Sequence, residues 1–283
     1  MNENSCRLTP GMLNNTSKTT HESAYFAFID ILGFSQIVCS LSHEELEKVY
    51  FNLIQASVGL ALSGGRYQFI EKSNQRLAVP DTSKALVNSL LVSDSILVWT
   101  ENDSMKSFID LIAVVRNLMR YSFCFGMPLR GAISIGPATF FSGRSPSPMA
   151  NFHFSLFGKP IVEAATLEKQ QQWSGCIVDS KAVDCYRKKC SSSTQNTDQL
   201  ATVAYLCEKG LIARYPAPMK IGGGVQFVEN YVINWVTGTK TPESDIEVVG
   251  AFSKHKKSID QPSVRQKIEN TFHFVQTMTS SKV

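Results

Sequence analysis

The chain alternates between short apolar runs and longer amphipathic stretches, and this pattern predicts its secondary structure. The first run, AYFAFIDILG, is almost continuously apolar and rich in aromatic and β-branched residues, which is typical of a strand buried on both faces. A capping box of Ser42 and Glu45 then begins a stretch with helical spacing. The pattern predicts, in chain order, a strand at 24–33, a helix at 42–62, a hairpin at 86–100, a helix at 104–125, a strand at 128–136, a helix at 158–173 and a strand at 175–179.

The order of these elements predicts the fold class. It reads β-α-β-β-α-β with a further helix and strand, which is the split pattern of ferredoxin-like domains. We therefore expect an α+β domain whose antiparallel sheet carries helices on one face. The remaining segments are predicted as a flexible arm at 1–22, a polar excursion at 66–85, a loop at 136–149, a solvated helix and loop at 180–200, a strand at 225–236 and a final helix at 262–278.

Composition and charge exclude several functional classes. Hydrophobic residues make up 43% of the 283 positions, which is enough for a well-packed core. The net charge is +4 and the basic residues are scattered, so we expect no nucleic-acid partner. The chain shows neither a long apolar span nor a secretory signal, so we expect a cytoplasmic protein with no membrane partner. Seven cysteines without a Cys-x-x-Cys spacing indicate reduced thiols rather than disulfides or a zinc site.

Two aspartates are candidate metal ligands. Asp30 interrupts the apolar run, where a buried carboxylate is costly unless it caps the turn before Gly33 or a cation offsets its charge. Asp94 lies at the tip of the predicted hairpin, where an aspartate is also an ordinary turn residue. In a split βαββαβ sheet the first strand neighbours the hairpin, so the two carboxylates can meet. Two carboxylates together with substrate phosphates are a usual way to hold magnesium.

Four segments in this order resemble the signatures of class III adenylate and guanylate cyclases. FIDILGFS (28–35) is similar to their acidic first strand, and SDS (93–95) is similar to their Gly-Asp-Ser hairpin. RGAISIG (130–136) resembles their Arg-x-Gly-Ile-x-x-Gly strand, and GKPIVEAATLE (158–168) resembles the start of a family helix. The resemblance implies a class III cyclase domain with a ferredoxin-like βαββαβ core at 23–180, followed by residues 181–283 as a C-terminal extension of the same domain.

The resemblance also implies roles for individual residues. Asp30, Asp94 and the carbonyl of Ile31 would hold two divalent cations, Mg²⁺ or Mn²⁺, that act on the triphosphate and the ribose 3′-hydroxyl. The resemblance assigns phosphate contacts to Arg130, Gly33 and Phe34. For Arg130, a surface arginine at the end of a strand remains the alternative.

Two departures from the family concern the base. The purine-reading lysine of the family corresponds to Leu90 here, and its second purine-reading residue corresponds to Ser155. A smaller base is therefore inferred, and the pattern is most similar to the pyrimidine cyclases of the bacterial Pycsar anti-phage systems, which make cyclic UMP or cyclic CMP as an alarm signal. Tyr50, on the first predicted helix, is a candidate to cap the base, and a core tyrosine is the alternative.

A third departure concerns the reacting phosphate. The Asn and Arg of the family helix correspond to Val162 and Thr166, which leaves the Thr166 hydroxyl as the catalytic candidate and Lys159 or Lys169 as nearby charges. The expected reaction converts UTP to cyclic UMP and pyrophosphate. CTP or a purine triphosphate is the alternative substrate, and a degenerate cyclase fold that binds without chemistry also stays open. The resemblance further implies a homodimer with composite sites and a separate effector for the cyclic nucleotide.

Overall fold

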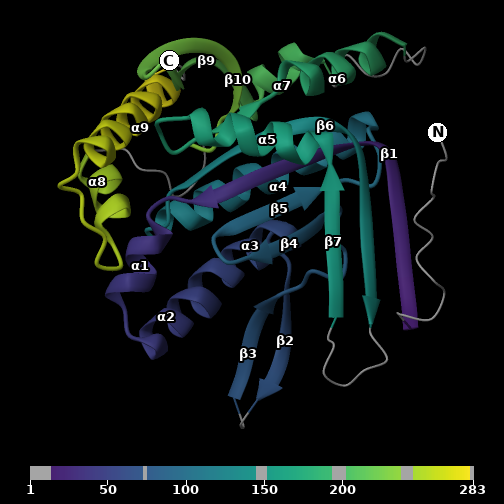
Figure 1. Ribbon diagram of the computed structural model, residues 1–283, viewed down its shortest axis with the longest axis horizontal. Coiled ribbons are helices and arrows are strands. Elements are labelled where there is room, and N and C mark those ends of the chain that lie inside the picture. Colours follow the sequence, from purple (N-terminus) through teal and green to yellow (C-terminus); the bar gives the residue numbers. More distant parts are fainter. Residues whose placement is uncertain (1–13, 73–74, 145–151, 193–201, 237–244, 281–283) are drawn as a thin grey trace, which may run out of the picture.

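The computed structural model describes residues 14–72, 75–144, 152–192, 202–236 and 245–280 (Figure 1). Its strands are β1 (Asn14–Ile31), β2 (Tyr67–Lys72), β3 (Gln75–Pro80), β4 (Asn88–Val92), β5 (Ser95–Trp99), β6 (Leu129–Arg144), β7 (Phe152–Gly158), β8 (Cys176–Val178), β9 (Ile212–Ile221) and β10 (Gly224–Ile233). Its helices are α1 (Phe34–Ser40), α2 (His43–Val49), the π-helical η1 (Tyr50–Gln55), α3 (Ala56–Ser63), α4 (Met105–Cys124), α5 (Lys159–Gln170), α6 (Ser180–Ser192), α7 (Val203–Glu208), α8 (Asp245–Ser253) and α9 (Pro262–Ser280).

One large sheet runs in the order β4-β5-β1-β6-β8-β10-β9, and β7 pairs with β6. Its strands β4-β5-β1-β6 pair antiparallel, in the order of a split βαββαβ domain. Strand β8 joins β6 in parallel, and antiparallel β10 and β9 continue the sheet. The predicted α+β class with an antiparallel-dominated sheet is therefore confirmed, and strands from the C-terminal part belong to the same sheet.

The helical stretch after β1 forms for the local reason that the sequence indicates. The Ser42 hydroxyl accepts a hydrogen bond from the backbone N–H of Glu45, and the Glu45 carboxylate accepts one from the backbone N–H of Ser42. From there α2, η1 and α3 follow one another without a break, and Gly64 ends the stretch with a left-handed φ of 59°. The helix predicted at 42–62 is confirmed, with a π-helical segment inside it.

The hairpin predicted at 86–100 is also confirmed. Pairing between β4 and β5 ends at Val92 and Ser95, so Ser93 and Asp94 form a two-residue turn. Ser93 adopts a φ of 56°, as such turns require. The turn therefore places Asp94 at the tip of the hairpin.

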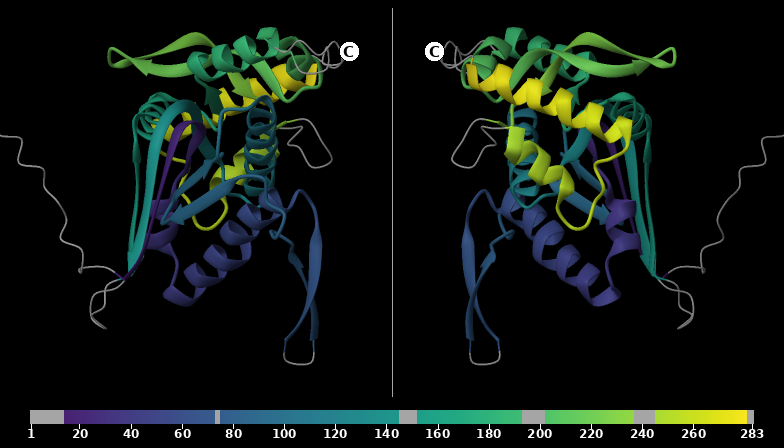
Figure 2. Two further views of the ribbon diagram at one scale, coloured as in Figure 1. Left: turned by 90° about the vertical axis from the view of Figure 1, so that its right-hand side faces the viewer. Right: turned by 90° about the vertical axis from the view of Figure 1, so that its left-hand side faces the viewer.

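Different helices cover the two faces of the sheet (Figures 1 and 2). On one face α4 packs against β1, where the ring of Tyr25 lies 4.9 Å from the ring of Phe108. On the other face α5 lies on β6, where the Ser134 hydroxyl donates to the Glu163 carboxylate across 3.1 Å. Helix α5 thus departs from the expectation of helices on a single face, because buried Phe26 on β1 makes this second face apolar as well.

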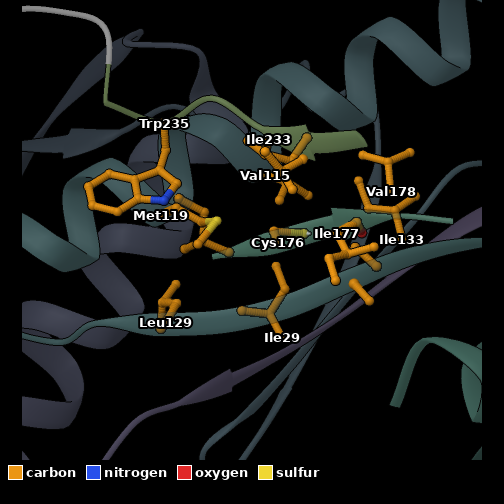
Figure 3. Close-up of a cluster of buried hydrophobic side chains, with 14 of the residues drawn as sticks. Ile29, Val115, Met119, Leu129, Ile133, Cys176, Ile177, Val178, Ile233 and Trp235 are labelled. Carbon is orange, nitrogen blue, oxygen red and sulfur yellow. Dashed lines mark hydrogen bonds between the residues drawn. The ribbon is translucent and has the colours of Figure 1, made fainter. Parts of the chain in front are cut away.

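The main core lies between α4, the sheet and the C-terminal helices. Ile29 of β1, Val115 of α4 and Ile233 of β10 are fully buried there (Figure 3). The ring of Phe274, on α9, lies 4.6 Å from that of Trp173. Helix α9 therefore shares one core with the first strand.

Several segments differ from their prediction. Residues 14–22, predicted as an arm, form the first half of β1 and pair along β6, which therefore runs through part of the loop predicted at 136–149. Residues 66–85, predicted as an irregular excursion, contain the β2–β3 hairpin. These strands follow from pairing with a partner strand rather than from apolar alternation. Residues 1–13, 145–149 and 193–200, which also carry predictions, lie outside the described ranges.

The described ranges contain neither a helix that could span a membrane nor a disulfide. None of their helices combines the length and apolar character that are needed to cross a membrane. No disulfide joins the cysteines that these ranges contain.

Candidate active site

Asp30 and Asp94 lie side by side at one end of the sheet. Asp30 is the penultimate residue of β1 and pairs with Ser95 of β5 and Arg130 of β6. The backbone N–H of Ile31 donates to the backbone carbonyl of Asp94 across 3.1 Å, which fastens the hairpin turn to the end of β1. Tertiary structure thus brings the two candidate metal ligands together, as the split-sheet topology predicts.

An ion pair lies directly beside Asp30. The Nε of Arg130 donates to the Glu168 carboxylate, its Nη1 donates to the carbonyl of Gln171 across 3.0 Å, and its Nη2 lies 3.9 Å from Oδ2 of Asp30. The side chains of Arg130 and Glu168 are only 14% and 2% exposed. Arg130 is therefore not a surface arginine, and a phosphate would have to compete with Glu168 for it.

Glu168 is a site residue that the sequence reading did not single out. It lies on the inner side of α5 with buried Ala164, one helical turn earlier. A glutamate on the apolar side of an amphipathic helix is the signal that could have identified it. Gln171 extends the same network, because its Nε2 donates to the carbonyl of Gly131 across 2.6 Å.

The surroundings raise the pKa of the Asp30 carboxyl to about 7. Burial is the largest cause, Glu168 and Asp94 add negative charge, and Arg130 and Lys169 oppose them. A nearby divalent cation would favour the ionised carboxylate and offset this negative charge. The donors are carboxylate oxygens, which Mg²⁺ and Mn²⁺ prefer, so the residues present fit such an ion.

Further ligands would have to come from elsewhere. Within the described ranges, no group of three or more His, Cys, Asp or Glu side chains is placed to hold a metal ion. Backbone carbonyls such as that of Ile31, and the phosphates of a substrate, are the remaining kinds of oxygen donor.

The turn after β1 presents backbone rather than side chains. Gly33 is exposed and has a left-handed φ of 78°, and its carbonyl accepts hydrogen bonds from the N–H groups of Gln36 and Ile37. A Cβ at this position would lie 3.0 Å from Cδ of Lys257, so both conformation and space favour glycine. Phe34 is buried, so its side chain anchors the turn and only its backbone is suited to a phosphate contact.

Thr166 does not point toward the carboxylates of its own chain. It is exposed on α5, and its hydroxyl donates to the carbonyl of Val162 across 2.8 Å. Thr166 and Glu168 are two residues apart, so about 200° of rotation around the helix separates them. The structure therefore does not join Thr166 to the site that Glu168 helps to form.

The three candidates for base binding are dispersed. Leu90 pairs with Leu97, which pairs with Phe28, so Leu90 faces the same side of the sheet as Asp30. Tyr50 packs against the core, and burial raises the pKa of its hydroxyl, which favours the core-tyrosine alternative.

Ser155 is the most distant of the three. It is exposed on β7 opposite Phe141, whereas Asp30 lies opposite Arg130 on the same strand β6. The separation of 141 − 130 = 11 residues corresponds to about 36 Å of extended strand. Ser155 therefore cannot reach a nucleotide that Asp30 of the same chain holds.

Comparisons with known proteins give partial structural likenesses. No protein-family model and no curated protein sequence matches the chain. The catalytic core of a rhodopsin-guanylyl cyclase with converted specificity, in complex with ATPalphaS, is similar at 12% identity and a TM-score of 0.46, covering 77% of this chain and 98% of that one. The guanylate cyclase domain of RhGC from Catenaria anguillulae in complex with GTP is similar at 14% identity and a TM-score of 0.44, covering 78% of this chain and 100% of that one.

The adenylyl cyclase CyaB from P. aeruginosa is similar at 13% identity and a TM-score of 0.43, covering 80% of this chain and 98% of that one. At such identities and TM-scores these likenesses do not themselves assign a function. The assignment depends on the chemistry of the site.

Proposed function

We propose that this chain is a nucleotidyl cyclase that converts UTP to 3′,5′-cyclic UMP and pyrophosphate. The observation that carries the proposal is the contact between the end of β1 and the hairpin turn, which sets Asp30 beside Asp94. The segments that resemble class III cyclases meet around this contact. FIDILGFS includes the end of β1, SDS includes the hairpin turn, RGAISIG belongs to the adjacent strand β6, and GKPIVEAATLE belongs mainly to α5.

In the proposed reaction the ribose 3′-oxygen forms a bond to the α-phosphorus, and the bond from that phosphorus to the bridging oxygen of pyrophosphate breaks. The proton of the 3′-hydroxyl passes to solvent. Mg²⁺ or Mn²⁺, held by Asp30, Asp94 and the Ile31 carbonyl, would stabilise charge on the phosphates and lower the pKa of the 3′-hydroxyl. The backbone at exposed Gly33 and at its neighbour Phe34 would orient the triphosphate at the end of β1, and the Arg130–Glu168 pair holds β6 and α5 in place around it.

The side chains around Leu90, the residue expected at the base, support a pyrimidine over a purine. Leu90 and its neighbours Leu97 and Phe28 offer no charged group to the edge of a purine. CTP, with cyclic CMP as product, is the nearest alternative to UTP. Because Ser155 is remote from Asp30 of its own chain, we place it in the site of a second copy, in a homodimer with composite sites. By the Pycsar resemblance, the product would act in the cytoplasm as an anti-phage signal for a separate effector.

The experiment is an assay of the purified protein with each of the four ribonucleoside triphosphates and Mn²⁺, with chromatography of the cyclic product. We expect product from UTP. Asp30→Asn and Asp94→Asn should each lower turnover by about 100-fold or more, because changes even to groups that only support metal ligands cost about 10- to 100-fold. Asp184→Asn is the matched control, since Asp184 is exposed on α6 and paired with Arg187. Near-normal turnover in either site variant would show that the metal assignment is wrong.

A nucleotide-binding protein without chemistry is the second candidate. The observation that favours it is that the Thr166 hydroxyl is bonded within its own helix, while Arg130 is paired with Glu168. Neither group is then poised to stabilise charge on the reacting phosphate. Tight binding of UTP without product from any of the four triphosphates would establish this candidate and exclude the cyclase.

A further inference from the structure

A pocket adjoins the turn that follows Asp30. Gly33 and Gln36 line one side of it, and Lys257, Ser258 and Lys267 of the C-terminal part line the other. The backbone N–H of Ser258 donates to Oε1 of Gln36 across 2.9 Å, which fastens the α8–α9 loop to α1 (Figures 1 and 2). Leu32 also lines the pocket, so the pocket begins two residues after Asp30 and adjoins the carboxylate pair.

Lys257 has a structural role in this pocket. Its side chain is buried, and its Nζ donates to the carbonyls of Gly126 and Ala251 across 2.8 and 3.2 Å. Both bonds tie the α8–α9 loop to neighbouring segments. Lys257 therefore has little remaining capacity to bind a ligand.

Lys267 differs from Lys257 in having no such partner. No residue of the described ranges forms a hydrogen bond or an ion pair with its ammonium group, although α9 leaves the side chain half-buried. Burial lowers the pKa of Lys267, the charges of Arg130 and Lys220 lower it further, and Glu168 opposes them. A half-buried ammonium without a partner is costly, and a bound anion would supply the missing contact.

Lys267 also lies within electrostatic reach of the carboxylate site. Arg130 and Glu168 both act on it, and Arg130 in turn lies 3.9 Å from Asp30. One end of the site thus carries carboxylates suited to a divalent cation, and the adjoining pocket carries an unpaired ammonium. A triphosphate with its metal would match this arrangement of charge, because its phosphates carry more negative charge than one divalent cation neutralises.

We propose that Lys267 of α9 binds the terminal phosphates of the nucleotide, so that the C-terminal part of the chain completes the phosphate site. The proposal rests on the proposed function for where the nucleotide lies. Negative charge grows on the pyrophosphate as its bond to the α-phosphorus breaks, and an ammonium at this position stabilises that charge. Lys267 would supply from α9 a positive charge that Val162 and Thr166 cannot supply from α5.

The test is titration calorimetry with inorganic triphosphate and Mg²⁺, a probe that cannot be cyclised, followed by the same titration with UTP. We expect Lys267→Met to weaken binding of both ligands by about tenfold or more, since one charge-assisted contact is lost. Lys267→Arg should retain most of the affinity, because it keeps the charge. Lys188→Met is the matched control, since Lys188 is exposed on α6.

Each outcome bears on the proposal. If wild type does not bind inorganic triphosphate, or if Lys267→Met and Lys188→Met bind it equally well, the role of Lys267 is refuted. Should Lys267→Met fail to fold by circular dichroism, Lys267→Gln replaces it in the same comparison. Binding through Lys267 without cyclic product would refute the cyclase and retain this inference. If Lys267→Met forms cyclic UMP with an unchanged KM, the cyclase is retained and the role of Lys267 is refuted.

Discussion

Replacing Arg130 by methionine tests whether this arginine is committed to Glu168 or available to a phosphate. The variant leaves a carboxylate that is 2% exposed with neither a partner nor water. Removing one partner of a buried ion pair typically costs about 3–5 kcal/mol. Because Arg130 itself keeps 14% exposure, and because Glu168 can take up a proton, we expect a value near the lower limit, about 3 kcal/mol.

Urea unfolding followed by tryptophan fluorescence measures this cost, since Trp173 and Trp235 are fully buried in the core. With a slope of about 3 kcal/mol/M, the midpoint should fall by about 1 M. The double variant Arg130→Met with Glu168→Leu removes both charges, and we expect it to cost less than Arg130→Met alone, because apolar replacements of buried pairs are often neutral. The control is Arg187→Met, whose exposed partner is Asp184 and whose expected cost is below about 1 kcal/mol.

An Arg130→Met variant that costs no more stability than Arg187→Met would refute this expectation. That result would mean that Glu168 does not depend on Arg130, and that the guanidinium is available to a ligand. A double variant that costs as much as the sum of the two single variants would also contradict the ion pair, because independent sites are additive.

Two further predictions concern pH and the core. Burial lowers the pKa of Lys257 to about 7, below its value of 10.5 in an unfolded chain, so the unfolded state binds more protons between these limits and the free energy of unfolding should rise with pH there. Lys257→Met should remove this rise in urea unfolding at pH 7 and pH 9, and an unchanged pH dependence would contradict the burial of the ammonium. Phe274→Ala should cost about 3–5 kcal/mol, since its ring contacts Trp173 in the shared core. Thermal unfolding of Phe274→Ala, followed by calorimetry, should remain a single transition. A separate transition of the C-terminal part would show that this part folds independently.

Local sequence signals predicted an element correctly where the interaction that stabilises it joins residues close together in the sequence. Ser42 and Glu45 cap each other three residues apart, and Ser93 with Asp94 forms a turn within one hairpin. The buried strand that carries Asp30 is evident because its apolar run is continuous. These short-range features predict the α+β class, since the order of elements follows from them.

Strands that form through distant partners were not predictable in the same way. Residues 14–22 are polar in composition, and they become a strand because they pair with the far half of β6. The β2–β3 hairpin at 67–80 likewise depends on pairing rather than on apolar alternation. Propensity for a strand depends strongly on context, so a local pattern does not reveal such pairs.

Some residues of the candidate site were predictable from the sequence, and others were revealed only by the tertiary structure. Sequence by itself made Asp30 and Asp94 candidates, because Asp30 interrupts an apolar run and the order of elements places the hairpin of Asp94 beside it. Only tertiary structure decided that Arg130 is paired with Glu168 and that Lys267 lies near both of them. Glu168 stands out on the apolar side of its helix, but nothing local to α5 shows that its partner is Arg130. Their charges interact because the packing of α5 and α9 against the sheet removes water and brings segments that are distant in the sequence close together.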